Sequence, residues 1–111
     1  MKGAKLIFWN KERFIMSSGK TIIIEVDIWS VPEPKRHLYP DGLKFGWIAC
    51  NKENPDERIL VDYNLKKGFH YHVDQEPIVK LEWVSLEHTQ QLFIKMTKKK
   101  FGEFVEKTSI F

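Results

Sequence analysis

The segment TIIIEVDIW, residues 21–29, constrains the fold of this chain more than any other stretch. Apolar residues occupy every second position, so an extended backbone would place them on one face. These residues are Ile22, Ile24, Val26 and Ile28. The other face would carry Ile23, Glu25, Asp27 and Trp29. The alternation therefore predicts a strand in a sheet that packs on one face and leaves the other partly in water.

Other short segments with strand-like patterns lie along most of the chain. Val31-Pro32-Glu33-Pro34 must end the first clear strand, because proline lacks the backbone N–H that a ladder needs. Polar turns are expected at 17–19, 51–56 and 74–77. A hairpin turn is expected at Asn10-Lys11, although no glycine supports it. The predicted strands are 4–9, 12–16, 22–29, 43–49, 59–63, 69–73 and 78–83.

The C-terminal part of the chain has the pattern of one helix. Ser85 can serve as the N-cap, Glu87 complements the positive helix end, and Gly102 can end the helix after Phe101. The fold prediction is thus α+β, with an antiparallel β-sheet of five to seven strands and a C-terminal α-helix packed on one face. The 111 residues provide one core, so a single domain over 1–111 is expected.

Composition indicates the cellular compartment expected for the protein. Cys50 is the only cysteine, which excludes an intrachain disulfide, and no apolar run approaches the roughly 20 residues of a membrane helix. The opening MKGAKLIFWNKERF has no stretch typical of a signal peptide, so a cytoplasmic protein without membrane contact is expected. The net charge of +3 is compatible with RNA but does not require it.

The stretch 62–74, DYNLKKGFHYHVD, gathers the residues most suited to chemistry. If 69–73 is extended, His70 and His72 share one face, and a tight hairpin would bring Asp62 and Lys67 beside them. Two imidazoles can exchange protons near neutral pH, and a cation can stabilise a charged phosphorane, as metal-free RNA cleavage needs. We therefore take His70, His72, Lys67 and Asp62 as catalytic candidates. The candidates for binding nucleic acid are Lys66, Lys67, Tyr63 and Tyr71.

Two other interpretations of this stretch stay open on spacing alone. The H-x-H pattern could hold a metal ion, with Asp62 or Asp74 as a third ligand beside His70 and His72, although no cofactor is expected. Equally, two histidines on the wet face of a hairpin can have no chemical role. The spacing by itself leaves the function undecided.

The order of motifs resembles that of TumE-type toxins from toxin–antitoxin pairs. Lys5-Leu6-Ile7 is similar to the opening of that family, and Val26-Asp27-Ile28-Trp29-Ser30-Val31-Pro32 to its V-x-I-W-x-V-P element. Asp62, Lys67, Gly68, His70 and His72 match a signature of the form Y-D-N-x-x-G-K-G-D-H-x-H. The chain departs from this signature at Val61, Tyr63, Lys66 and Phe69.

The resemblance implies a single TumE-like domain that acts as the toxin of a type II toxin–antitoxin system. It also implies an RNA or translation target and a cognate antitoxin, expected to be a helix-turn-helix protein. We interpret the activity as that of a metal-independent ribonuclease. The alternative is a non-catalytic module of small α+β type that binds nucleic acid or protein. An open edge strand, at 4–9 or 78–83, would accept an antitoxin segment or a second copy of the chain.

Isolated aromatic and thiol groups are better explained by packing than by chemistry. Trp9, Trp29, Trp47 and Trp83 are expected in the core or at an interface. Cys50 has no histidine at a recognisable spacing and is expected to be a small buried residue.

Overall fold

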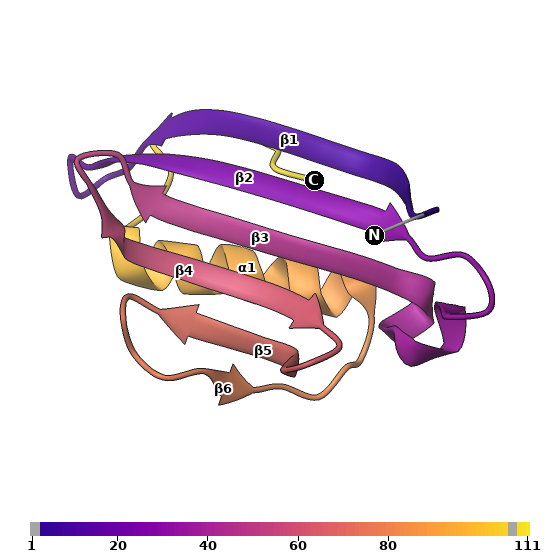
Figure 1. Cartoon of the computed structure of the whole chain (residues 1–111). Coiled ribbons are helices and arrows are strands. Elements are labelled where there is room, and N and C mark those ends of the chain that lie inside the picture. The colour runs from indigo at the N-terminus through magenta and orange to yellow at the C-terminus, as the bar shows by residue number, and fades with distance from the viewer. Residues whose placement is uncertain (1–2, 107–108) are drawn as a thin grey trace.

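Six strands follow one another along the chain, and each pairs antiparallel with its neighbour in sequence (Figure 1). The computed structural model describes residues 3–106 and 109–111. The sheet order is β1-β2-β3-β4-β5-β6, which confirms the predicted α+β fold with an antiparallel sheet and one C-terminal helix. The strands are β1 (Lys5–Ile15), β2 (Thr21–Ser30), β3 (Leu43–Asn51), β4 (Asn54–Asn64), β5 (Gly68–Val73) and β6 (Val79–Lys80).

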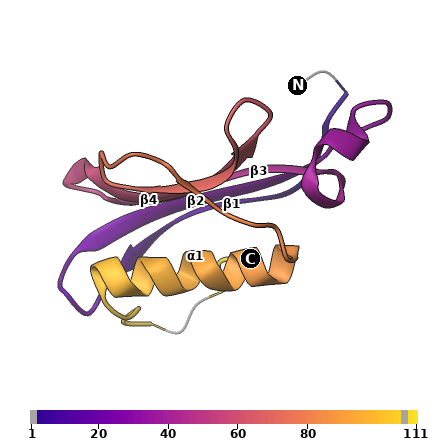
Figure 2. The ribbon, with the colours of Figure 1, turned by 90° about the horizontal axis from the view of Figure 1, so that it is seen from below.

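Helix α1 (Leu86–Phe101) lies on one face of the sheet, and the chain end returns beneath β1 and β2 on the same side (Figure 2). Two short 3-10 turns, η1 (Arg36–Leu38) and η2 (Pro40–Gly42), connect β2 to β3. The Ser85 side chain accepts a hydrogen bond from the His88 N–H at 3.0 Å, and the Gly102 N–H donates to the Lys98 carbonyl at 2.8 Å. Both predicted helix caps are therefore confirmed. No helix in the described part of the chain is long and apolar enough to cross a bilayer.

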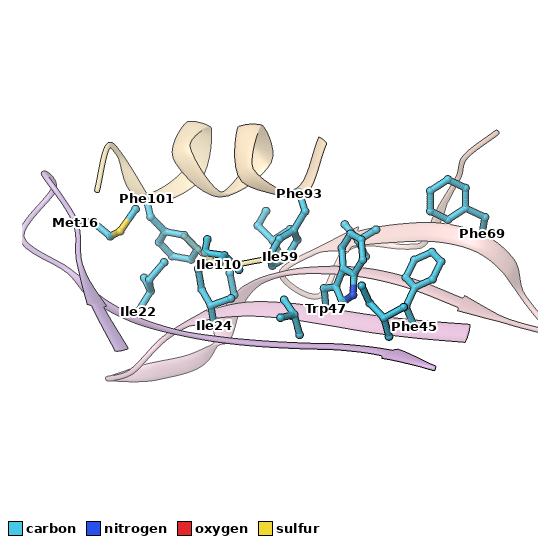
Figure 3. Packing of buried hydrophobic residues seen from close by; sticks show 14 residues of the cluster. Met16, Ile22, Ile24, Phe45, Trp47, Ile59, Phe69, Phe93, Phe101 and Ile110 are labelled. Carbon is cyan, nitrogen blue, oxygen red and sulfur yellow. The ribbon is translucent and has the colours of Figure 1, made fainter. Parts of the chain in front are cut away.

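The apolar face of β2 packs as its alternation predicted. Ile22, Ile24, Val26 and Ile28 are all buried and belong to one core cluster. In this cluster Ile22 and Ile24 lie with Phe101 of α1 and Ile110 of the C-terminal segment (Figure 3). Trp47 of β3 is at the centre, with its ring 5.8 Å from Phe93 and 4.6 Å from Phe111. Its indole N–H donates to the Asp27 carbonyl at 2.8 Å, so its one polar atom is satisfied inside the core.

The predicted hairpin at Asn10-Lys11 is wrong, because residues 5–15 form one continuous strand. Asn10 pairs with Val26 and Lys11 with Glu25, so the long strand β2 holds β1 extended through the expected turn. A two-residue turn would need positive φ angles, which neither residue favours strongly enough to break this pairing. The result is an edge strand of 11 residues.

Strands β4 and β6 also differ from the prediction. Strand β4 begins at Asn54, so the polar turn is reduced to Lys52-Glu53. Strand β6 covers only Val79–Lys80, whereas a strand over 78–83 was expected. The chain leaves the edge after Leu81 because Leu81 and Trp83 turn to pack against the core, with the Trp83 ring 5.5 Å from Phe69. This crossing leads the chain to α1.

The four tryptophans do not share one environment. Trp47 is fully buried and Trp29 and Trp83 are half-buried, but Trp9 is 55% exposed on β1. A core position is therefore confirmed for Trp47, whereas Trp9 lies outside the core. Cys50 is half-buried, and burial raises the pKa of its thiol.

Replacing the central tryptophan should separate core packing from surface contact. Trp47→Ala should lower the free energy of unfolding by about 3–5 kcal/mol, because it leaves a cavity and removes the contacts with Phe93 and Phe111. Trp9→Ala, the matched control, should cost about 1 kcal/mol or less. Urea unfolding of both variants, followed by far-UV circular dichroism, provides the measurement. Similar losses in the two variants would contradict this placement of the core.

Candidate functional site

The sheet face turned away from α1 carries most of the ionisable side chains of the strands. One row of paired residues crosses all six strands of this face in the order Trp9, Asp27, Gly46, Asp62, His70 and Lys80. The adjacent row contains Lys11, Glu25, Ile48, Leu60 and His72. Strand alternation explains the separation, since the other face of the same strands is filled by the core. We call this second surface the open face.

His70 is held rigidly at the end of the first row. Its side chain is only 1% exposed, and its Nδ1 lies 2.9 Å from the Gly68 carbonyl. A carbonyl oxygen only accepts hydrogen bonds, so Nδ1 carries the proton. The other ring nitrogen, Nε2, faces Oδ2 of Asp62 at 3.8 Å. The predicted proximity of His70 and Asp62 is thus present, and His70 is more buried than a surface histidine.

His72 lies beside His70, with a ring centroid separation of 5.3 Å, and it remains partly accessible. Burial lowers the pKa of His72, and electrostatic interactions with His70, Lys67 and Arg58 lower it further. A backbone hydrogen bond with Glu76 acts in the opposite direction. The net effect favours the neutral imidazole, which is the form that accepts a proton.

A short loop links Asp62 to Lys67. The Asn64 amide donates to Oδ2 of Asp62 at 3.3 Å, and its oxygen accepts from the Lys67 N–H at 2.8 Å. Gly68 follows with φ of +72°, a backbone conformation that residues with a side chain rarely adopt, and β5 begins at this glycine. Lys66 and Lys67 are both exposed in this loop, and the Lys80 ammonium donates to the Lys67 carbonyl.

Three predicted site residues are not brought to this group. Tyr63 and Tyr71 lie on the side of the sheet that packs toward α1, where the Tyr63 hydroxyl donates to the Leu38 carbonyl at 2.6 Å. They cannot stack on a base bound at the histidines, because residues of odd number in β4 and β5 point to the other face. Asp74 accepts hydrogen bonds from Lys100 and from the Arg58 N–H, each through a carboxylate oxygen.

The position of Asp74 bears directly on the metal alternative. Its carboxylate is 2.8 Å from the Lys100 ammonium of α1, so it does not complete a ligand set with His70 and His72. Residues 3–106 and 109–111 contain no group of three or more His, Cys, Asp or Glu side chains arranged to hold a metal ion.

Sequence reasoning missed three residues of the open face. Asp27 accepts a hydrogen bond from the Gly46 N–H at 2.8 Å, and Gly46 has no side chain to separate Asp27 from Asp62. Arg58 is two positions before Leu60 on the same side of β4. The alternation of β2 already placed Asp27 on the polar face, but only the pairing register shows which residues of other strands it joins.

No family model matches the chain, and no curated protein or solved structure matches it either. The resemblance to TumE-type toxins therefore rests on the sequence motifs alone.

Removing the nearby loop cation should change the titration of His72. Lys67→Ala should raise the pKa of His72, because the Lys67 charge disfavours the imidazolium. Proton NMR titration of the His72 ring provides the measurement, and Lys99→Ala on α1 is the control for loss of a lysine elsewhere. An unchanged pKa in the folded Lys67→Ala protein would contradict the placement of Lys67 beside His72.

The same low pKa makes folding sensitive to acid. Below about pH 6.5, the ordinary pKa of histidine, the unfolded chain takes up a proton at His72 more readily than the folded chain does. Stability contributed by neutral His72 is therefore full above that pH and is lost as the pH falls toward the lower folded pKa. His72→Gln should reduce this loss, measured by urea unfolding at pH 7.5 and 5.0, with His88→Gln as control. An equal loss in wild type and in the His72→Gln variant would exclude this contribution.

Proposed function

We propose that this chain is the toxin of a type II toxin–antitoxin pair and that it cleaves RNA without a metal ion. The observation that carries the proposal is the placement of His70, His72 and Asp62 on the open face, with Lys67 in the adjoining loop and the two imidazoles 5.3 Å apart. General acid–base groups and a cation in one place are what cleavage through the 2′-hydroxyl needs. The toxin role itself comes from the sequence resemblance.

The different burial of these side chains supports different parts for them in the proposed reaction. His72, which is partly accessible and has a lowered pKa, takes the proton of the 2′-hydroxyl as the 2′-oxygen attacks phosphorus. The ammonium of Lys67 stabilises the charged phosphorane and donates the proton to the leaving 5′-oxygen. His70 is a positioning residue, since it has almost no exposed surface, and its ring packs against the ring of His72. Asp62 supports His70 and the loop that carries Lys67.

An antitoxin needs a surface to bind, and β1 offers one. This edge strand exposes Leu6, Ile7, Trp9 and Ile15 by 45% to 62% of their surface. Exposed edge strands with apolar side chains readily pair with an added strand. We propose that a segment of the cognate antitoxin lies along β1, adjacent to the open face that β1 shares with the histidines.

One observation favours the alternative function. The nearly complete burial of His70 leaves His72 as the only histidine of the pair that can reach a substrate in this conformation. A non-catalytic module would bind nucleic acid through the lysines of the loop and would not depend on either imidazole. The two functions therefore differ in whether His72 is needed.

Replacing His72, the accessible histidine, distinguishes the ribonuclease from the non-catalytic binding module. Expression of the wild-type chain in a bacterial host should arrest growth, and the purified protein should cut single-stranded RNA in the presence of EDTA to give 2′,3′-cyclic phosphate ends. His72→Ala should slow cleavage by roughly 10²–10⁴-fold, the usual contribution of a general base. His88→Ala, which removes an exposed histidine of α1, should leave cleavage unchanged.

The result for the His72→Ala variant decides between the two functions. Full cleavage or full growth arrest by a folded His72→Ala protein would rule out the acid–base mechanism. RNA binding that weakens with salt, with no cleavage in any variant, would favour the binding module.

A further inference from the structure

Arg58 lies next to the candidate site without being part of any sequence motif. It is in β4, two residues before Leu60, and Leu60 pairs with His72 of β5. Residues 58, 60 and 62 point to the same side of the strand, so Arg58 shares the open face with His72. The two are diagonal neighbours across the β4–β5 pair, a relation in which long side chains can meet.

The guanidinium of Arg58 has an unsatisfied donor. Its Nε is buried and has no hydrogen-bond partner in the described residues. None of the salt bridges formed by those residues involves Arg58. The nearest partner by pairing, Asp74, instead uses its carboxylate to accept from the Arg58 backbone N–H and from Lys100. A buried donor without an acceptor costs free energy, and no hydrogen bond or salt bridge of the described residues engages the guanidinium.

The surroundings of His72 favour an anion. The charges of Lys67 and Arg58 both act to lower the pKa of His72. Arg58 comes from the strand on one side of His72, and Lys67 comes from the loop that precedes β5. An anion between them would meet a cation on each side of the imidazole.

We propose that the guanidinium of Arg58 binds a phosphate group of the RNA beside His72, through its terminal N–H groups. Arginine suits this role because its planar fork donates two parallel hydrogen bonds to an oxyanion. This inference rests on the proposed function for the identity of the ligand, but the anion site itself can be tested without RNA cleavage. Lysine could replace the charge of Arg58 and not its fork.

The first experiment uses inorganic phosphate as the probe. Phosphate should shift the NMR signals of the Arg58 Nε–H and the His72 ring in a saturable way, whereas chloride at the same ionic strength should not. Arg58→Ala should abolish the saturable shift at His72, and Arg58→Lys should weaken it. Arg13→Ala, which removes an arginine from the exposed edge strand, is the matched control and should leave it unchanged. Circular dichroism checks that each variant is folded.

The second experiment uses an oligonucleotide with a 2′-deoxy substitution at each position, which cannot be cleaved through the 2′-oxygen. Arg58→Ala should raise the dissociation constant of this oligonucleotide roughly tenfold, as expected for the loss of a charge-assisted hydrogen bond. It should also reduce the slope of log affinity against log salt concentration by about 1, the value for one phosphate contact. Arg58→Lys should retain the salt dependence and recover only part of the affinity.

The outcomes distinguish this inference from the proposed function. A saturable phosphate shift that survives in folded Arg58→Ala protein would overturn the role of Arg58, even if the wild type cleaves RNA. A shift that depends on Arg58, in a protein that never cleaves RNA, would support the anion site and reject the ribonuclease. Phosphate binding by Arg58→Lys as strong as that of the wild type would overturn recognition by the guanidinium fork.

Discussion

The packing of α1 and the C-terminal segment against one face of the sheet is the interaction on which the rest of the structure depends. Trp47 contacts both Phe93 of the helix and Phe111 of the chain end, so segments far apart in sequence meet on a single side chain. The alternating isoleucines and Val26 of β2 supply the apolar surface beneath them. Burial of this apolar area is the main favourable term in the folding of a chain of this size.

Burial of one face determines the character of the other. Because side chains alternate along a strand, packing the apolar positions of β2 to β5 leaves the polar positions of the same strands on the open face. Asp27, Asp62, His70 and His72 thus come together through the requirements of the core, from three different strands. A surface that gathers ionisable groups in this way is suited to binding or chemistry, since the scaffold beneath it is rigid.

The open face contains polar groups that are not fully satisfied within the chain. Nε2 of His70 faces Asp62 across 3.8 Å, beyond a hydrogen bond, and Nε of Arg58 has no partner in the described residues. His72 is kept toward its neutral form by burial and by neighbouring positive charge. Such groups cost stability in the free protein, and that cost is characteristic of sites that complete their contacts only with a ligand.

The sequence by itself determined which residues of each strand share a face, and where the helix begins and ends. Both are local properties: a period of two residues in β2 and β5, and the capping groups Ser85 and Gly102. The sequence alone therefore places His70 and His72 on one side of a strand, with Asp62 and Lys67 near them.

Only the tertiary structure decided the register between strands and the burial of each side chain. Pairing with β2 keeps β1 straight through Asn10-Lys11, and pairing across β3 sets Gly46 between Asp27 and Asp62. The burial of His70 and the unpaired Nε of Arg58 likewise depend on neighbours from other strands and loops. These features could not be predicted locally, because contacts between distant segments are fixed by the packing of the whole core.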